Sequence, residues 1–151
     1  MKNNKTLNQK ISEAKALIIK ALKKHGNGVY VAFSGGKDSY VLLKMAREIR
    51  FNILVIYNEH KGENPKLVSG LLIIKEPKKI NVPKFLKLVK LTAQLDGTRK
   101  DEDKLVMING KDIHRSKMKT NYTKKGVWGL EVYFPLFNFT EKDIYEYFRR
   151  K

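Results

Sequence analysis

The stretch Ser34–Ser39 reads Ser-Gly-Gly-Lys-Asp-Ser, so it combines two glycines with hydroxyl, ammonium and carboxylate side chains. Before it, the apolar segment Gly28–Phe33 predicts a buried strand, and after it, apolar residues at helical spacing from Ser39 to Arg50 predict a helix. A glycine turn at the start of a helix leaves backbone N–H groups unpaired, and the helix dipole there favours an anion. We therefore expect this turn to bind phosphate groups.

The residue types in the turn suit phosphate individually. Gly35 and Gly36 allow the backbone to approach an anion without an intervening Cβ atom. Ser34 and Ser39 can donate hydroxyl hydrogen bonds, and Lys37 can place its ammonium on a phosphate oxygen. Together they predict a site for a chain of phosphates.

Asp38 carries a negative charge and cannot contact phosphate favourably without an intervening cation, so we expect it to bind Mg²⁺ or to cap the helix. The candidate binding stretch begins at Ala32 and Phe33, the last residues of the expected strand. Its spacing differs from the Walker loop. It resembles the pyrophosphate loop of the adenine nucleotide α-hydrolase superfamily, whose members bind ATP and cleave between its α- and β-phosphates. A glycine turn that binds nothing is the alternative.

The net charge of +17, from 32 Lys and Arg against 15 Asp and Glu, predicts attraction to polyanions. Nucleotides, RNA or an acidic protein surface would all fit this charge. Lysine enrichment that serves solubility, from a high-temperature or AT-rich source, is an equally good explanation.

The chain contains no cysteine, which excludes thiolate zinc sites, iron–sulfur clusters and thiol nucleophiles supplied by this chain. Its three histidines are scattered, so we expect no zinc site. No apolar run is long enough to span a membrane, and the first ten residues are polar. We expect a single domain over residues 1–151, located in the cytoplasm.

A βαβ unit is expected around the glycine turn, because Phe51–Tyr57 forms a second continuous apolar segment after the helix. Two apolar strands joined by a helix predict an α/β fold with a mostly parallel sheet. Asn58 and Glu59 then follow a central strand, at the sheet edge where such folds bind ligands. We expect Asn58 to bond to a ribose and Glu59 to hold Mg²⁺ or a ribose hydroxyl, whereas His60 is expected to be solvated.

The other expected elements follow from local signals. Asn109-Gly110 predicts a hairpin turn, Thr140 with Asp143 predicts a capping box, and Gly26 a helix end. The expected helices cover Thr6–His25, a segment starting at Pro83 and a segment after Thr140 with Ile144, Tyr147 and Phe148 buried; the expected strands are Leu71–Ile74, Leu91–Leu95, Leu105–Ile108, Lys111–His114 and Val127–Phe134, with a basic loop over Arg115–Gly126.

Three stretches, Ser34–Ser39, Gly97–Glu102 and Phe134–Ile144, resemble in order and approximate register the phosphoadenosine phosphosulfate reductase family. This family also contains the small subunit of ATP sulfurylase and the adenylyltransferase that makes FAD. The resemblance implies a three-layer, Rossmann-like fold with helices on both sides of the sheet. It also implies that Gly97 and Arg99 bind the nucleotide, with Arg99 on a phosphate, and that Arg115 is a second clamp. Lys37 and Arg99 would be the catalytic residues.

This chain departs from the family at several places. The reductase branch uses a cysteine, so we do not expect sulfonucleotide reduction here. Asn58–Gly62 stands where the family has Asp-Thr-Gly, Phe139 replaces a tryptophan, and the chain is short before Arg99. The expected function is binding of ATP or an adenylyl sulfonucleotide with Mg²⁺, followed by α–β phosphate cleavage or adenylyl transfer.

Two other hypotheses keep the nucleotide site. In one, a tRNA-modifying ATPase binds RNA through its basic surface. In the other, a nucleotide-binding module works only with a partner subunit. A homodimer is also compatible with the sequence. For the enzyme, we expect Lys37→Ala and Arg99→Ala to weaken turnover greatly and to leave the fold intact.

Overall fold

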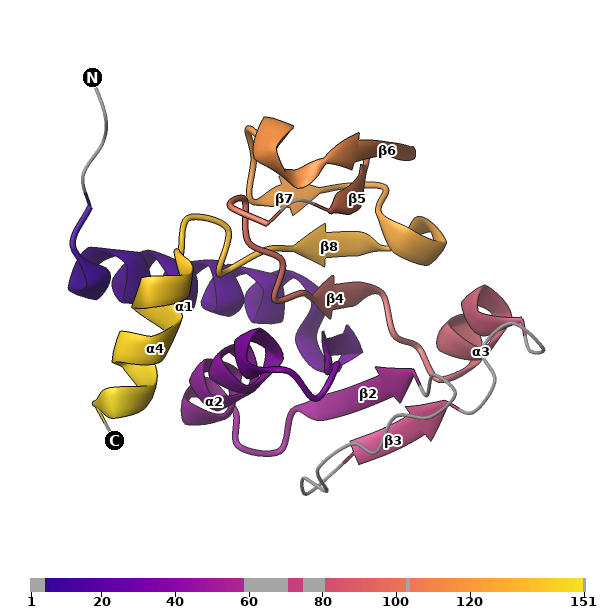
Figure 1. Cartoon of the computed structure of the whole chain (residues 1–151). Helices are drawn as coiled ribbons and strands as arrows, with labels where there is room; N and C mark the ends of the chain where they lie inside the picture. Colours follow the sequence, from indigo (N-terminus) through magenta and orange to yellow (C-terminus); the bar gives the residue numbers. More distant parts are fainter. Residues whose placement is uncertain (1–4, 59–70, 75–80, 103, 151) are drawn as a thin grey trace.

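The structure is a computed structural model that describes residues 5–58, 71–74, 81–102 and 104–150. Its main sheet has the strand order β3-β2-β1-β4-β8-β7 (Figure 1). Neighbouring strands from β3 to β8 run parallel, and β7 is antiparallel to β8. The strands are β1 (Val29–Ala32), β2 (Leu54–Asn58), β3 (Leu71–Ile74), β4 (Ala93–Leu95), β7 (Tyr122–Thr123) and β8 (Glu131–Tyr133). The predicted α/β fold with a mostly parallel sheet is confirmed.

Helices cover both faces of this sheet. Val31, Val55 and Leu95 point into a core shared with α1, α2 and α4, whereas Tyr30 and Ile56 point to the opposite face and pack against α3. Figure 1 shows α3 and α4 at opposite sides of the molecule. The helices are α1 (Leu7–His25), α2 (Lys37–Ile49), α3 (Val82–Leu88) and α4 (Glu141–Arg149). This alternation along each strand produces the expected three layers.

The helix ends follow the local signals in the sequence. Thr6 forms a capping box with Gln9 at the start of α1, and Gly26 ends that helix with φ 57°. Thr140 and Asp143 form the predicted capping box of α4. On α4, Ile144 and Tyr147 are buried as expected, but Phe148 is 40% exposed, so its predicted burial is wrong.

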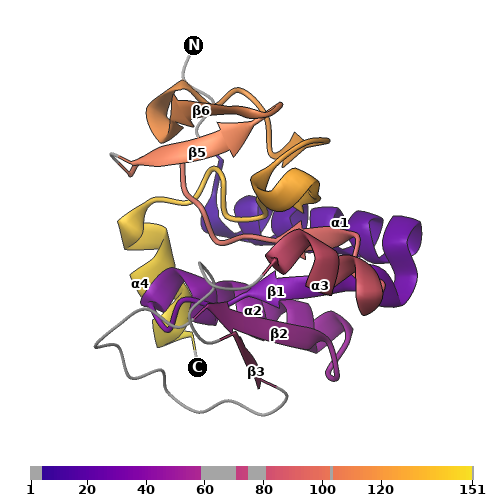
Figure 2. The same ribbon diagram turned by 90° about the vertical axis from the view of Figure 1, so that its right-hand side faces the viewer.

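A separate hairpin lies above the main sheet in the view of Figure 2. It consists of β5 (Leu105–Ile108) and β6 (Lys111–His114), paired antiparallel. Asn109 and Gly110 have φ values of 52° and 79°, as the predicted tight turn requires. One side of the hairpin packs on a small core with Met118, Val132 and Phe134.

The structure corrects three strand predictions. The second strand begins at Leu54, because Phe51 lies in a turn and is 83% exposed. Similarly, β4 begins two residues later than the predicted Leu91. Val127–Gly129 forms the 3₁₀ turn η4 instead of extended chain, and Trp128 within it has φ 55°. The expected basic loop Arg115–Gly126 contains β7 and the 3₁₀ turn η3 (Arg115–Lys117).

The topology places one crevice at the centre of the sheet. Val31 of β1 pairs with Val55 of β2 on one side and with Leu95 of β4 on the other. The chain leaves β1 toward β2 through α2, and β4 is added on the other side of β1. The connections therefore diverge beyond the carboxyl ends of β1 and β4, which is where open α/β sheets bind ligands. Within the described ranges, no helix has the length and apolar character that crossing a bilayer requires.

Candidate functional site

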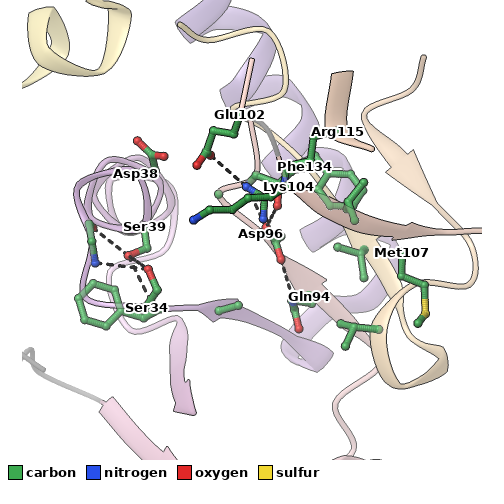
Figure 3. Close-up of a pocket in the computed structure, with 18 of the residues that line it drawn as sticks. Ser34, Asp38, Ser39, Gln94, Asp96, Glu102, Lys104, Met107, Arg115 and Phe134 are labelled. Carbon is green, nitrogen blue, oxygen red and sulfur yellow. Dashed lines mark hydrogen bonds and ion pairs between the residues drawn. The ribbon is translucent and has the colours of Figure 1, made fainter. Parts of the chain in front are cut away.

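A cavity of about 700 Å³ opens at this crevice (Figure 3). Its volume lies in the range of sites for small molecules. The loop after β1, the loop after β4, the β5–β6 hairpin and η4 all contribute to its wall. The sequence-predicted residues that line it are Ala32, Phe33, Ser34, Gly36, Lys37, Asp38, Ser39, Gly97 and Arg115. The three stretches of the sequence that supply these residues are therefore brought together around one space.

The glycine turn after β1 is closed by its two serines. The hydroxyl of Ser39 accepts a hydrogen bond from the N–H of Ser34 at 3.2 Å and donates one to the carbonyl of Gly36 at 3.0 Å. The two hydroxyl oxygens are 3.1 Å apart, and the N–H of Gly36 donates to Ser34 Oγ at 3.3 Å. Gly35 has φ 83°, a backbone angle that other residues adopt only with strain. This geometry explains the need for both serines and for glycine at position 35.

The helix that starts at this turn has no side-chain cap. The N-cap residue of α2 is Gly36, and the described residues show no side-chain cap hydrogen bond at this end of the helix. By contrast, Thr6, Asn81 and Thr140 cap α1, α3 and α4. The backbone donors at the start of α2 are thus available at the cavity, which favours an anion. The expectation that Asp38 caps this helix is wrong, because Asp38 lies within its first turn and makes a different contact.

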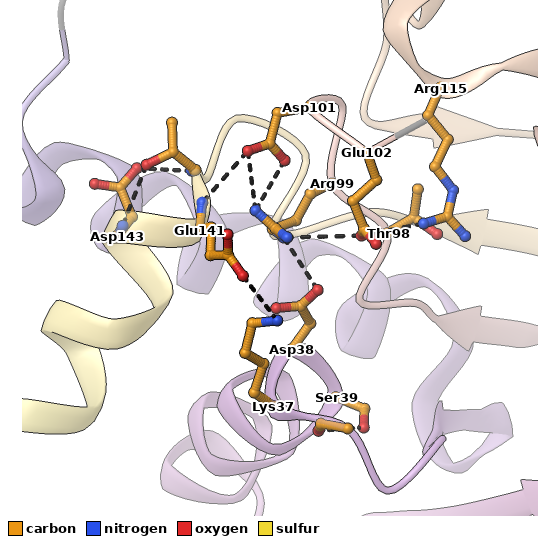
Figure 4. Close-up of polar contacts among 12 residues, drawn as sticks. Lys37, Asp38, Ser39, Thr98, Arg99, Asp101, Glu102, Arg115, Glu141 and Asp143 are labelled. Atoms are coloured by element: carbon orange, nitrogen blue, oxygen red, sulfur yellow. Dashed lines mark hydrogen bonds and ion pairs between the residues drawn. The ribbon is translucent and has the colours of Figure 1, made fainter. Parts of the chain in front are cut away.

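That contact is with Arg99. Arg99 Nε donates to Asp38 Oδ2 at 3.0 Å, and Arg99 NH1 donates to both carboxylate oxygens of Asp101 at 2.8 and 3.0 Å (Figure 4). The side chain of Arg99 is only 5% exposed and is not among the described residues that line the cavity. Burial lowers the pKa of Arg99, but the hydrogen bond and charge of Asp38 outweigh it, so the pKa is raised. The guanidinium is a charged link between the loop after β4 and the first turn of α2.

Because Gly97 has no side chain, the loop after β4 can lie close to the first turn of α2. A Cβ atom at Gly97 would lie 3.4 Å from the backbone carbon of Asp38 and 3.5 Å from the N atom of Ser39. The loop after β4 therefore packs directly on the first turn of α2. A larger side chain at position 97 would push the two apart.

Arg115 lines the cavity from the hairpin side. Its NH1 donates to Glu102 Oε1 at 3.1 Å, and its Nε donates to the carbonyl of Leu105 at 3.4 Å. Its side chain is 18% exposed. Of the two predicted arginines, only Arg115 therefore faces the space that a ligand could occupy.

Lys37 also lines the cavity, but its ammonium contacts a carboxylate. Lys37 Nζ lies 3.2 Å from Glu141 Oε1, at the start of α4 (Figure 4). The hydrogen bond to Glu141 raises the pKa of Lys37, so this side chain stays protonated at neutral pH. Lys37, the side chain predicted to bind phosphate, is thus charged and already paired with Glu141.

Three polar residues that the sequence analysis did not assign, Gln94, Asp96 and Thr98, line the cavity, and the buried Tyr30, which does not line it, bonds to Gln94. The buried hydroxyl of Tyr30 donates to Gln94 Oε1 at 2.5 Å, and Gln94 Nε2 donates to Asp96 Oδ2 at 2.9 Å. The other oxygen of Asp96 accepts bonds from the N–H and hydroxyl of Thr98 at 2.8 and 2.5 Å. Asp96 could have been identified, because it directly follows an apolar strand. The roles of Tyr30 and Gln94 carry no such signal.

Met107 of the hairpin, Trp128 of η4 and Phe134, which follows β8, provide an apolar part of the wall. Phe134 opens the third stretch of the family resemblance, but nothing in the sequence pattern singled out Met107 or Trp128. Of the two residues predicted after β2, Asn58 is the last strand residue, but its side chain, like all of Glu59, lies outside the described residues. His60 lies outside them too.

A magnesium ion would find one suitable ligand in this wall. Asp38 Oδ1 is buried and has no hydrogen-bond partner among the described residues, while Oδ2 is bonded to Arg99. Mg²⁺ is commonly held by one or two carboxylates together with phosphate oxygens and water. The described part of the chain contains no cluster of three or more potential metal ligands. The arrangement therefore fits an ion that arrives with a nucleotide.

Comparison with solved structures identifies flavin adenylyltransferases as neighbours. The FMN adenylyltransferase of Candida glabrata, solved with FMN and the ATP analogue AMPCPP, superposes with a TM-score of 0.68 at 14% identity. The match covers 94% of this chain and 55% of that chain. Yeast FAD synthetase, solved with FAD, has a TM-score of 0.57 at 14% identity and is matched over 98% of this chain and 61% of its own.

This chain thus spans little more than half of the neighbours' length. No protein-family description matches the sequence. No curated protein matches it either. The comparisons show that the chain has the α/β fold of these FMN adenylyltransferases.

Proposed function

We propose that this protein binds the triphosphate of ATP in the cavity and transfers its adenylyl group to a second substrate. One observation supports the proposal most strongly. The helix that begins at the cavity, α2, has no side-chain cap, and its first turn faces a space large enough for a nucleotide at the divergence of β1 and β4. Neighbours with the same fold were solved with FMN and an ATP analogue, or with FAD and inorganic pyrophosphate.

The β- and γ-phosphates would lie on the turn after β1. Backbone N–H groups from Gly35 to Ser39 would donate to them, that of Gly36 after giving up its bond to Ser34 Oγ, with the hydroxyls of Ser34 and Ser39 nearby. Lys37 would add its ammonium after exchanging Glu141 for a phosphate oxygen. Ala32 and Phe33 would border the nucleotide next to the turn.

Arg115 and Arg99 have different parts in this proposal. Arg115 lines the cavity and could contact a phosphate directly, as the family resemblance implies. A phosphate contact of Arg99 would require its guanidinium to leave Asp38 or Asp101. We therefore assign Arg99 to holding Asp38 and the start of α2 in place, and Arg115 to the ligand.

Asp38 Oδ1 would coordinate Mg²⁺ together with phosphate oxygens. The ion would neutralise charge on the phosphates and help pyrophosphate to leave. Asp38 Oδ2 stays on Arg99 in this arrangement, so the carboxylate orientation is fixed before the nucleotide binds.

The acceptor would occupy the side of the cavity beneath the hairpin. Met107, Trp128 and Phe134 offer an apolar wall there, which suits a flat ring system. The acceptor oxygen attacks the α-phosphorus, a new phosphorus–oxygen bond forms, and pyrophosphate takes the electrons of the broken bond. With water as the acceptor, the products would be AMP and pyrophosphate.

An assay of pyrophosphate release tests the proposal. The protein is incubated with Mg²⁺ and ATP, alone and with FMN, and the products are separated by chromatography. We expect ATP-dependent pyrophosphate release and a rate at least about a hundredfold lower in Lys37→Ala. Lys23→Ala, an exposed lysine of α1, is the control and should keep the wild-type rate. Absence of both ATP binding and pyrophosphate release would contradict the proposal.

The same assay separates the two other hypotheses from the sequence. Release that needs tRNA, and that weakens as salt rises, would favour the RNA-binding hypothesis. Nucleotide binding with turnover only after a second chain is added would favour the partner-dependent module.

A further inference from the structure

We propose that Glu141 is a positioning residue that holds Lys37 away from the phosphate turn until a nucleotide displaces it. The inference rests on the proposed function, because it concerns the same lysine. It adds a residue from the far end of the chain to the nucleotide site, and it predicts how that residue sets affinity and product release.

The direction of the Lys37 side chain carries the inference. Its Nζ lies 3.2 Å from Glu141 Oε1 and 5.8 Å from the centre of the Tyr145 ring, and both partners belong to α4. Figure 4 shows Lys37 extending from the start of α2 toward Glu141, whereas Ser39 leaves the helix on another side. The ammonium is therefore engaged by α4 and not by the turn whose phosphate it is proposed to bind.

The backbone at Glu141 is held in a fixed place. Its backbone N–H donates to Asp101 Oδ2 at 3.3 Å, and Asp101 in turn binds Arg99 through both oxygens. The capping box of Thr140 and Asp143 fixes the start of α4. Because the carboxylate sits on an anchored helix, the flexible four-carbon stem of Lys37 is the part that moves.

The pair is weak enough to be exchanged. The side chains of Lys37 and Glu141 are 36% and 58% exposed, and exposed ion pairs of this kind contribute little. A bound pyrophosphate presents several negative oxygens beside uncapped backbone donors, so it competes well for the ammonium. When pyrophosphate leaves, Glu141 can take Lys37 back, which lowers the barrier to release.

Calorimetry with Mg²⁺ present tests this inference by measuring pyrophosphate binding to five proteins: wild type, Glu141→Gln, Glu146→Gln, Lys37→Ala and the double variant Lys37→Ala/Glu141→Gln. Glu141→Gln keeps the size of the side chain and removes its charge. We expect it to bind pyrophosphate about three- to tenfold more tightly than wild type. Glu146→Gln removes a charge from the same helix at a half-buried position, where Glu146 Oε1 lies 3.9 Å from Arg150 NH2. Its affinity should stay within about twofold of wild type.

The double variant Lys37→Ala/Glu141→Gln distinguishes an effect of Glu141 on Lys37 from direct repulsion between Glu141 and pyrophosphate. If Glu141 acts through the lysine, Glu141→Gln should give no gain in the Lys37→Ala background. An equal gain in both backgrounds would overturn the inference, since it would show simple repulsion between Glu141 and the ligand. Unchanged or weaker binding in Glu141→Gln alone would also overturn it. A wild-type protein that binds neither pyrophosphate nor ATP would refute the proposed function itself, and the inference with it.

Discussion

Arg99 Nε donates a hydrogen bond to Asp38 Oδ2 at 3.0 Å, although the two residues are 61 positions apart in the chain. This bond joins the loop after β4 to the first turn of α2, the helix that starts at the phosphate turn. Two motifs that the sequence presents separately thus share one buried ion pair. The orientation of the proposed nucleotide site depends on that pair.

The first prediction concerns the stability of this link. Arg99→Ala should lower the free energy of unfolding by about 3 kcal/mol, because it leaves a partly buried Asp38 carboxylate without its counter-charge. The burial of Arg99 therefore revises the expectation that this variant leaves the fold intact. Arg99→Lys keeps the charge but loses the forked geometry, so its loss should be smaller. Urea unfolding measures both, and a wild-type midpoint for Arg99→Ala would disprove this account of the link.

The second prediction concerns Gly35. Its φ of 83° makes Gly35→Ala strained by about 1–2 kcal/mol and should displace the amides of the turn, with about a tenfold loss of pyrophosphate affinity. Gly26→Ala is the matched control, because Gly26 also has a positive φ, of 57°, but lies at the end of α1 and not in the turn after β1. Both variants should lose thermal stability, and only Gly35→Ala should lose affinity. Equal affinity in the two variants would argue against a phosphate site at the turn.

The third prediction concerns the hydrogen bond from the buried Tyr30 to Gln94, a residue that lines the cavity. Burial raises the pKa of Tyr30, so its hydroxyl stays protonated and donates to Gln94 at 2.5 Å. Tyr30→Phe should cost about 1–2 kcal/mol, because Gln94 Oε1 loses its buried donor. Tyr133→Phe is the comparison, since the Tyr133 hydroxyl makes only a long, 3.4 Å contact with His25 Nε2. A larger loss in Tyr133→Phe than in Tyr30→Phe would contradict this assignment.

The fourth prediction concerns pH and the anchoring of α4. Burial raises the pKa of Asp143, but hydrogen bonds from Lys10 and from Thr140 outweigh it and hold the pKa below the usual 3.8. A carboxyl with a lowered pKa in the folded state stabilises the protein above its unfolded pKa, and this contribution disappears as the pH falls through the folded pKa. Lys10 Nζ lies 2.6 Å from Asp143 Oδ2, and this ion pair connects α1 to α4.

Asp143→Asn should therefore be less stable than wild type by about 1 kcal/mol at neutral pH. This difference in stability should stay constant down to about pH 5. It should then become smaller as the pH falls below the usual Asp pKa. Thermal unfolding from pH 3 to pH 8 measures it. A gap that grows as the pH falls would have the wrong sign for this ion pair.

Elements with strong local signals were predictable from the sequence. Thr6 and Gly26 mark the ends of α1, and Asn109-Gly110 sets the hairpin turn, because the physical requirement at each lies within a few residues. The order of apolar strands around Ser34–Ser39 was likewise sufficient to predict the parallel sheet and the edge at which the cavity opens.

Long-range pairs were not predictable in the same way. No local pattern indicates that Asp38 faces Arg99 or that Lys37 reaches Glu141, since each contact depends on how separate loops pack. Trp128 was expected in an extended strand, but its positive φ turns the chain at η4 and places it against the cavity. Tertiary packing overrode the apolar pattern there.

The central claim is that the turn after β1 binds phosphate through its backbone. A titration of ¹⁵N-labelled protein with Mg²⁺ and pyrophosphate, followed by the amide chemical shifts, tests it most directly. The account predicts the largest shifts at the amides of Gly35, Gly36 and Lys37, saturating with a single affinity. Shifts confined to surface lysines such as Lys124 and Lys125, with the amides of the turn unchanged, would contradict it.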